Sequence, residues 1–205
     1  MKVLVITGGI GSGKSQVCRI LNERFGIPVY EADARAKALY TEVPGMIDDM
    51  EKALRCHLRN ESGEFVPQKL AEVIFNDESA LRKVEEILFP VMIDDFSSWA
   101  ISQNKKVVAF ESATILEKPQ FDGFGDIVLL VDTPVSVRLA RASQRDNVDP
   151  EKIRARKEAQ PLMNRLSEGD TLERVNFTIK NVGTIDELGE NIREFVEKYE
   201  LTKML

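Results

Sequence analysis

Four glycines near the N-terminus separate an apolar run from a lysine and a serine that a phosphate ligand could use. The segment Gly8–Ser15 reads GGIGSGKS and fits the pattern G-x-x-x-x-G-K-[ST] at every fixed position. Small side chains let backbone N–H groups approach a phosphate chain, and a helix that begins near Lys14 adds its N-terminal donors. We expect Lys14 to reach the β- and γ-phosphates and the Ser15 hydroxyl to bind Mg²⁺. The segment predicts nucleotide binding, but kinases, switches and motor proteins share it.

Two acidic residues follow predicted strands, where an acceptor or a metal ion would approach. Asp33 comes after the second strand, so its carboxylate could take the proton of an attacking hydroxyl. The alternative is that Asp33 caps the helix that follows it. Glu111 ends the third predicted strand, and carboxylates there often hold the water shell of Mg²⁺. The alternative is a strand-end charge that faces water.

A cluster of basic residues lies in the second half of this acidic chain. Arg138, Arg141 and Arg145 share one face of a predicted helix by i, i+3 and i+4 spacing, and four more basic residues follow between 152 and 157. Arginines that close over a phosphoryl group stabilise its charge during transfer. We therefore expect a lid over residues 138–169, although a solvated helix surface with acidic partners is the alternative.

The elements that must position these residues alternate between short apolar strands and helices. The expected strands are Lys2–Thr7, Ile27–Tyr30, Lys106–Phe110, Asp126–Val131 and Phe177–Lys180. The expected helices around them are Lys14–Phe25, Ala34–Tyr40, Val135–Arg145, Pro150–Gln160 (ended by Pro161) and Ile185–Tyr199. This alternation indicates an α/β fold of three layers, in which helices flank a parallel sheet. The glycine segment then lies between a strand and a helix, as a phosphate-binding loop requires.

The stretch from Met46 to Asn104 is mostly helical and charged, with a break expected at Pro90. It carries no strand pattern, so we interpret residues 33–104 as a helical insertion beside the sheet. The chain is then expected to form one domain. Its core would be assembled from residues 1–32, 105–137 and 170–205, with the insertion and the lid as additions.

Composition excludes several classes of protein. Of the 205 residues, 43% are hydrophobic and 30% are charged, and the formal net charge of −6 is not that of a general nucleic-acid binder. No apolar run approaches the ~18 residues that a membrane span needs. Cys18, Cys56 and the single His57 cannot form a four-ligand zinc site. Reduced thiols in a cytoplasmic protein are the expectation.

Several segments together resemble the dephospho-CoA kinase family of P-loop kinases. Members of this family phosphorylate the ribose 3′-hydroxyl of dephospho-CoA with ATP, in the last step of coenzyme A synthesis. The resemblance covers nearly the whole chain. The matching segments read TGGIGSGKS, EADARAKAL, VDTPVSVRLARASQRD, RKEAQ (with Arg156 and Gln160) and FTIKNVG (with Asn181 and Gly183).

The resemblance implies roles for particular residues. Asp33 takes the position of the catalytic base, and Lys14 and Arg141 are expected to stabilise the migrating phosphoryl group, assisted by Arg145. The loop of Asn181 is expected near the adenine of ATP. Mg²⁺ would be held by Ser15 and through water by Glu111. The residues expected to bind ATP are Gly9, Gly11, Ser12, Gly13, Lys14, Ser15, Gln16, Arg145 and Asn181.

The chain departs from the family pattern at a few positions. Glu31 replaces the first acid of a D-A-D segment, Phe89 stands where the family often has histidine, and Gln16 replaces a threonine. The expected partners are dephospho-CoA and ATP, with neither nucleic acid nor membrane, in a monomer or homotrimer. Another small-molecule or nucleoside monophosphate kinase is the alternative function. A nucleotide-dependent switch is a further alternative, but the chain lacks a suitably placed D-x-x-G.

Overall fold

A computed structural model of the chain describes residues 1–146, 158 and 160–201. The chain divides into two compact units. The first, which we call the sheet unit, consists of Met1–Glu31 and Gln103–Leu205. The second, the helical unit, is Ala32–Ser102, which differs by one or two residues at each end from the insertion expected over 33–104.

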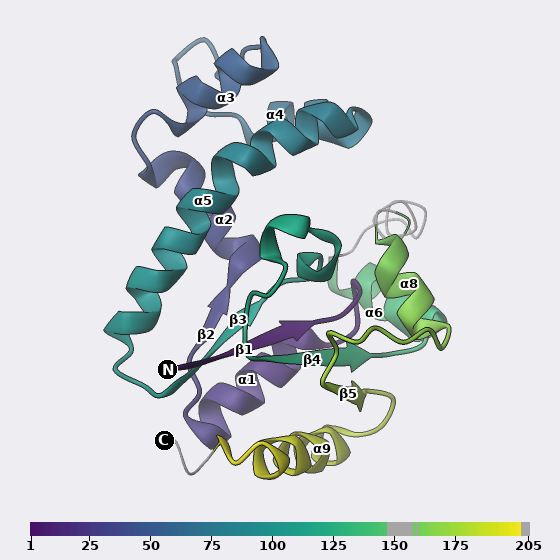
Figure 1. The fold of residues 1–205 in the computed structure, drawn as a ribbon. Coiled ribbons are helices and arrows are strands. Elements are labelled where there is room, and N and C mark those ends of the chain that lie inside the picture. The colour runs from purple at the N-terminus through teal and green to yellow at the C-terminus, as the bar shows by residue number, and fades with distance from the viewer. Residues whose placement is uncertain (147–157, 159, 202–205) are drawn as a thin grey trace. The chain divides into compact units, whose positions relative to one another are not determined.

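The sheet unit is built on five parallel strands in the order β2-β3-β1-β4-β5 (Figure 1). The strands are β1 (Lys2–Thr7), β2 (Val29–Glu31), β3 (Val107–Glu111), β4 (Ile127–Asp132) and β5 (Phe177–Lys180). The predicted α/β fold with helices flanking a parallel sheet is confirmed. After β1 the chain first forms β2 and β3 on one side of it, and later forms β4 and β5 on the other side. Ligands of open α/β sheets bind at such a switch point, outside the carboxyl ends of the strands.

Two helices cover one face of the sheet, α1 (Lys14–Phe25) and α9 (Ile185–Lys198). Val17, Ile20 and Leu21 of α1 follow helical spacing and are buried against apolar residues of the strands and of α9. Gly26 ends α1 in a left-handed conformation. Cys18 is buried in the same cluster, and burial, with the charge of Glu111 second, raises the pKa of its thiol. The α1 helix is therefore fixed by packing right up to the glycine loop.

The remaining described elements of the sheet unit follow β3 and β4. They are the short 3₁₀ helices η1 (Ile115–Glu117) and η2 (Pro119–Phe121), and the helices α6 (Val135–Asp146) and α8 (Pro161–Ser167). Pro161, which the sequence predicts to end the helix before it, is the first residue of α8. Proline suits that position, since its missing N–H would have no helical partner there. The helix predicted at Pro150–Gln160 falls almost entirely outside the described residues.

The helical unit contains four helices, α2 (Ala32–Glu42), α3 (Met46–Leu54), α4 (Pro67–Asn76) and α5 (Glu78–Ser102). The break predicted at Pro90 is wrong, because α5 continues through this residue (Figure 1). Val84, Leu88, Met92 and Phe96 recur every four residues and are all buried, so packing holds the helix on both sides of the proline. Proline is normally costly in a helix interior, and packing outweighs that cost here.

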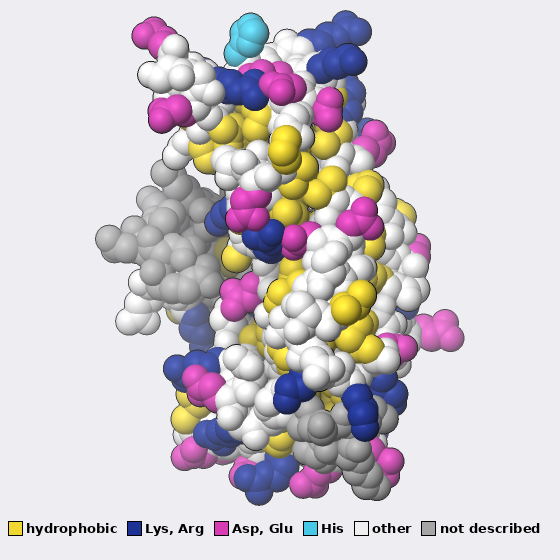
Figure 2. All heavy atoms as spheres, turned by 90° about the vertical axis from the view of Figure 1, so that its left-hand side faces the viewer, with side chains coloured by type: hydrophobic (Ala, Val, Ile, Leu, Met, Phe, Trp, Pro, Cys, Tyr) yellow, Lys and Arg dark blue, Asp and Glu magenta, His cyan; other side chains and the backbone are white. Residues whose placement is uncertain are grey.

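In the described part of the face shown in Figure 2, acidic and basic side chains are interspersed, with hydrophobic side chains between them. The described part of this face is therefore not a uniformly basic surface for a polyanion. Among residues 1–146, 158 and 160–201, no helix combines the length and apolar character that crossing a membrane would require.

Candidate functional site

The glycine loop connects β1 to α1 at the carboxyl edge of the sheet, as the sequence predicts. Gly8, Gly11 and Gly13 have φ angles of 151°, 75° and 96°, in the range that side-chain-bearing residues rarely adopt. Gly13 is the N-cap of α1, and its carbonyl accepts hydrogen bonds from the backbone of Gln16 and Val17 at 3.0 and 3.2 Å. The loop is therefore shaped by its backbone, and glycine is required by conformation at three of its four glycine positions.

Space, as well as conformation, requires small residues in the loop. A Cβ atom at Gly13 would collide with the Asn181 side chain, and one at Gly11 with the backbone carbonyl of Arg138. Gly9 has an ordinary φ, but a Cβ there would overlap the Arg138 guanidinium. The glycine loop is thus packed closely by residues from α6 and from the end of β5.

Lys14 is a cation held against the loop backbone. Its Nζ donates to the carbonyl of Gly8 at 3.0 Å and lies 3.5 Å from Oε1 of Glu111. Both side chains are about nine-tenths buried. Glu111 ends β3 and pairs in register with Ile6 of β1, so its carboxylate is brought to the loop by the sheet itself. The structure therefore brings together two of the residues that the sequence singled out, a cation and a carboxylate.

A network of hydrogen bonds ties the loop to the ends of β4 and β5. The carbonyl of Ser12 accepts from Asn181 Nδ2 at 2.8 Å and from Thr133 Oγ1 at 2.9 Å. The Asn181 carbonyl accepts from Thr133 Oγ1 at 3.2 Å and from Nη1 of Arg141 at 3.1 Å. Asn181 and Arg141, both predicted from the sequence, are therefore joined directly. Thr133 was missed, because one threonine after a strand has no signature that distinguishes it from a turn residue.

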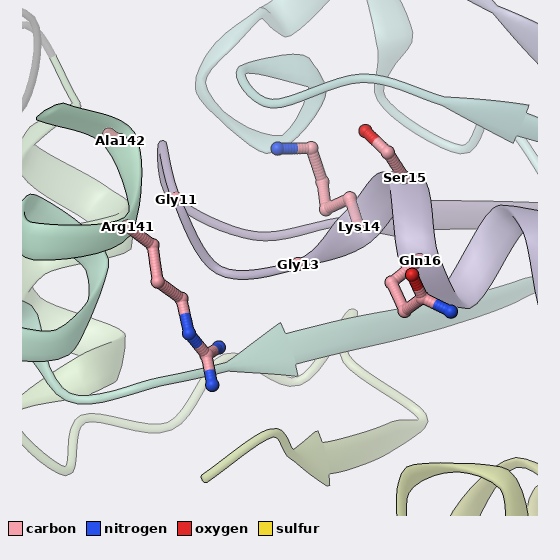
Figure 3. Close-up of a pocket in the computed structure, with 7 residues that line it drawn as sticks. All are labelled: Gly11, Gly13, Lys14, Ser15, Gln16, Arg141 and Ala142. Carbon is pink, nitrogen blue, oxygen red and sulfur yellow. The ribbon is translucent and has the colours of Figure 1, made fainter. Parts of the chain in front are cut away.

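Two pockets border this network. One of about 300 Å³ is lined by seven residues, Gly11, Gly13, Lys14, Ser15, Gln16, Arg141 and Ala142 (Figure 3). In Figure 3 the Lys14 and Ser15 side chains point to one side of the loop, and the Gln16 and Arg141 side chains lie on the other. A second pocket of about 250 Å³ continues past Asn181 to Gly183 and Leu188. The two share Gly13, Gln16 and Arg141, so a ligand with a phosphate chain and a flat ring system could occupy both.

One backbone donor of the loop is already bound within the protein. The N–H of Ile10 donates to Oε1 of Gln160 at 2.9 Å, and Gln160 directly precedes α8. The N–H groups of Leu162 and Met163 at the start of α8 donate to Oε1 of Glu117 at 3.2 and 3.5 Å. Burial raises the pKa of Glu117, against these two hydrogen bonds. Gln160 and Glu117 therefore anchor the segment around Pro161 to the loop and to η1.

The other predicted site residues lie in the helical unit or outside the described residues. Asp33 is exposed and lies in the first turn of α2, one residue inside the helix rather than at its N-cap. Asp33 belongs to the helical unit, whereas the glycine loop belongs to the sheet unit. Arg145 falls in α6, but its side chain, like the whole of Arg156, lies outside the described residues.

The oxygen donors near the loop suit a hard cation held mostly by its substrate. Within the described ranges, no cluster of three or more histidine, cysteine, aspartate or glutamate side chains could hold a metal ion. Mg²⁺ does not need such a cluster, because it commonly takes one or two protein oxygens, phosphate oxygens and water. The Ser15 hydroxyl lines the larger pocket, and the Glu111 carboxylate lies beside Lys14. The residues present fit this ion.

Comparison with known proteins decides among the nucleotide-using classes. A family model described as dephospho-CoA kinase matches residues 2–187. The chain belongs to the dephospho-CoA kinase family. A dephospho-CoA kinase from Porphyromonas gingivalis is 38% identical over 156 residues, which cover 76% of both chains. Membership in this family confirms the resemblance that the sequence segments indicated, and it excludes the nucleotide-dependent switch.

Solved structures agree on the fold. A crystal structure of a Thermus thermophilus protein has a TM-score of 0.81, with 23% identity over 96% of this chain and 97% of that one. A dephospho-CoA kinase from Campylobacter jejuni has a TM-score of 0.64, with 21% identity over 98% of both chains. Both structures cover nearly the whole chain and share its fold.

Proposed function

We propose that this dephospho-CoA kinase transfers the γ-phosphoryl group of ATP to the ribose 3′-hydroxyl of dephospho-CoA and so forms coenzyme A. The observation that carries the proposal is the family match over residues 2–187, which includes the complete glycine loop. The buried pair of Lys14 and Glu111 and the two linked pockets support nucleotide binding at that loop.

Each residue of the loop site has a proposed role in the transfer. Lys14 binds the β- and γ-phosphates, and Arg141 stabilises the charge that spreads over the migrating group. Arg141 starts from a position where its guanidinium already bonds the Asn181 carbonyl, so its rotamer is partly fixed before ATP arrives. Asn181 and Gly183 line the pocket that would take the adenine. Arg145 assists from the same helix as Arg141.

Mg²⁺ is proposed to bind the Ser15 hydroxyl and, through water, the Glu111 carboxylate, where it would neutralise charge on the phosphate oxygens. Asp33 is the proposed general base, which accepts the proton of the 3′-hydroxyl as that oxygen attacks phosphorus. The carboxylate is exposed on the helical unit, as a group that must meet an incoming acceptor should be. Closure of residues 138–169 over the phosphates would exclude water and prevent hydrolysis of ATP.

The test is to incubate the purified chain with ATP, Mg²⁺ and dephospho-CoA and to measure coenzyme A by mass spectrometry. Asp33→Asn is run in parallel, because it keeps the shape of the side chain and removes its basicity. Asp170→Asn is the matched control, since Asp170 is an exposed carboxylate of the sheet unit that forms a loose ion pair with Arg165 at 3.9 Å. We expect wild-type and Asp170→Asn to form coenzyme A and Asp33→Asn to be slower by about 10²-fold or more.

The possible outcomes test the proposed reaction and the proposed role of Asp33 separately. Equal rates for Asp33→Asn and the wild type would keep the reaction and remove Asp33 from it. No coenzyme A from the wild type, with ATP still bound, would contradict the proposed acceptor. Nucleoside monophosphates and small alcohols would then be screened with the same loop residues in place.

A further inference from the structure

Arg138 is a buried cation that the mechanism above does not use. It is 1% exposed and heads the largest fully buried side chains of the described chain. Sequence spacing places it on the same helix face as Arg141, yet Arg141 lines a pocket and Arg138 is fully buried. A fully buried arginine is unusual unless its charge and its donors are matched by partners.

The partners of Arg138 are incomplete. Its Nη2 donates to Oδ1 of Asn164 at 3.3 Å, a long hydrogen bond to a neutral group. Its Nε and Nη1 have no hydrogen-bond partner among the described residues. Burial lowers the pKa of Arg138, and the charge of Asp132 acts in the opposite direction, although no ion pair between the two is found in the described chain. Among the described residues, the guanidinium therefore remains short of a counter-charge.

The position of the guanidinium indicates what that counter-charge is. Arg138 lies directly against the glycine loop, with its backbone carbonyl against Gly11 and Nη1 against Gly9. Only the absence of a Cβ at Gly9 allows this approach, since Gly9 has an ordinary φ and needs no left-handed conformation. The cation therefore lies against the loop backbone and away from solvent. A charge interaction through such a low-dielectric interior is far stronger than across water.

We propose that Arg138 is a positioning residue whose buried cation, held behind Gly9, strengthens binding of the triphosphate and destabilises the protein without nucleotide. This inference rests on the proposed binding of ATP at the loop, but it does not depend on which acceptor is phosphorylated. The phosphate chain supplies a counter-charge that the described residues do not. The loop backbone between the Arg138 guanidinium and the phosphate chain is held in the conformation that presents its N–H groups to the phosphates.

The test compares Arg138→Met, which keeps length and apolar bulk without charge, with Arg138→Lys, which keeps the charge. Melting temperature is measured on the full chain without nucleotide, and the Kd of ATP with Mg²⁺ is measured by calorimetry without acceptor. For Arg138→Met we expect the melting temperature to rise by roughly 2–4 °C, the scale of a modest stability change in a chain of this length. We expect its Kd for ATP to rise roughly tenfold, and Arg138→Lys to recover most of that loss.

Arg193→Met is the control, because it removes the same charge from a side chain that is about half-exposed on α9 and distant in sequence from the loop. It should change neither quantity. A structural role alone would produce a different result, in which Arg138→Met melts lower or fails to fold and, where folded, binds ATP as the wild type does. Either observation would overturn the proposal, as would failure of Arg138→Lys to bind ATP better than Arg138→Met.

A double-mutant cycle checks the geometry on which the proposal stands. Gly9→Ala should be strongly destabilising with Arg138 present, because the added methyl group overlaps the guanidinium. In Gly9→Ala/Arg138→Ala that penalty should largely disappear, so the two changes should be far from additive. Additive effects would show that Arg138 does not lie behind Gly9. Absence of coenzyme A formation, with these ATP effects intact, would remove only the proposed acceptor.

Discussion

The loop region of the sheet unit and the body of the helical unit differ in whether their polar side chains have hydrogen-bond or ion-pair partners. Around the loop, Ser12 Oγ and two nitrogens of Arg138 are buried without a hydrogen-bond partner in the described chain. In the helical unit, Arg35 pairs with Asp95 at 2.7 Å and with Glu42 at 2.8 Å, and Arg59 pairs with Asp48 and Glu51. These buried polar atoms around the loop lack partners among the described residues, whereas these arginines of the helical unit are paired within it. An incomplete polar site is typical of a region that a ligand completes.

The largest effect is expected at the cation of the incomplete region. Lys14→Ala removes the charge that lies between the Gly8 carbonyl and Glu111, and it leaves that carboxylate buried beside an anionic substrate. We expect the rate of coenzyme A formation to fall by about 10²–10³-fold or more. Lys106→Ala, at an exposed lysine before β3, should leave the rate unchanged, and steady-state kinetics measure both. A loss below tenfold would contradict the role of Lys14.

Glycine substitutions sharpen the comparison, because both regions contain glycines with positive φ. Gly13→Ala brings strain at φ 96° and a collision with Asn181, whereas Gly45 has φ 81° and nothing within 4 Å of an added Cβ. We expect Gly13→Ala to lower the free energy of unfolding by about 3 kcal/mol and to abolish ATP binding. Gly45→Ala should lose only about 1–2 kcal/mol and bind ATP normally. Chemical denaturation and calorimetry distinguish them, and equal losses would remove the packing argument.

The ion pairs of the helical unit should matter for stability alone. Hydrogen bonds to Asp95 and then to Glu42 raise the pKa of the Arg35 guanidinium, against the smaller opposing effect of burial. Since the Arg35 side chain is one-third exposed, we expect Arg35→Met to lower the free energy of unfolding by only about 1 kcal/mol. The exposed pair of Arg82 and Glu78 is the control, with an expected change near zero for Arg82→Met. A changed Kd for ATP in Arg35→Met would break the comparison.

The smallest effect is expected at the capping box of α9. Hydrogen bonds from the backbone N–H and the hydroxyl of Thr184 lower the pKa of the exposed Glu187 carboxylate from 4.5. A depressed carboxylate pKa contributes stability above the unfolded value, and this contribution is lost as the pH falls through the folded value. The wild type should therefore melt slightly above Glu187→Gln at pH 7. The difference should vanish well below pH 4.5, and a constant difference would exclude this linkage.

Much of this architecture follows from local sequence, and the exceptions have physical causes. The boundaries of β1, α1 and β5 are predicted to the residue, because an apolar run or a helical apolar period defines each of them. Pro90 was expected to break a helix, but buried residues on both sides of it hold α5 together. Local propensity cannot report such tertiary packing. The same limit applies to Arg138, whose spacing predicts a lid arginine beside Arg141, although its side chain is buried against the glycine loop.

Some residues of the candidate site can likewise be predicted from the sequence, and others cannot. Lys14, Glu111, Arg141 and Asn181 are brought together by the sheet, and each followed from a motif or a strand end. Thr133 and Asn164 carry no sequence signal, because a single hydroxyl or amide acquires a role only from what the fold places beside it. The role of Asp33 stays a prediction, since it belongs to the helical unit.

The most direct test of the account is phosphorylation of two acceptors that differ by one oxygen. The protein is incubated with ATP and Mg²⁺ and either dephospho-CoA or its 3′-deoxyribose analogue, and the products are weighed by mass spectrometry. The account predicts the gain of one phosphoryl group by dephospho-CoA and none by the analogue, with equal binding of ATP in both reactions. Phosphorylation of the analogue, or of neither acceptor, would contradict the central claim that this loop delivers the γ-phosphoryl group to a ribose 3′-hydroxyl.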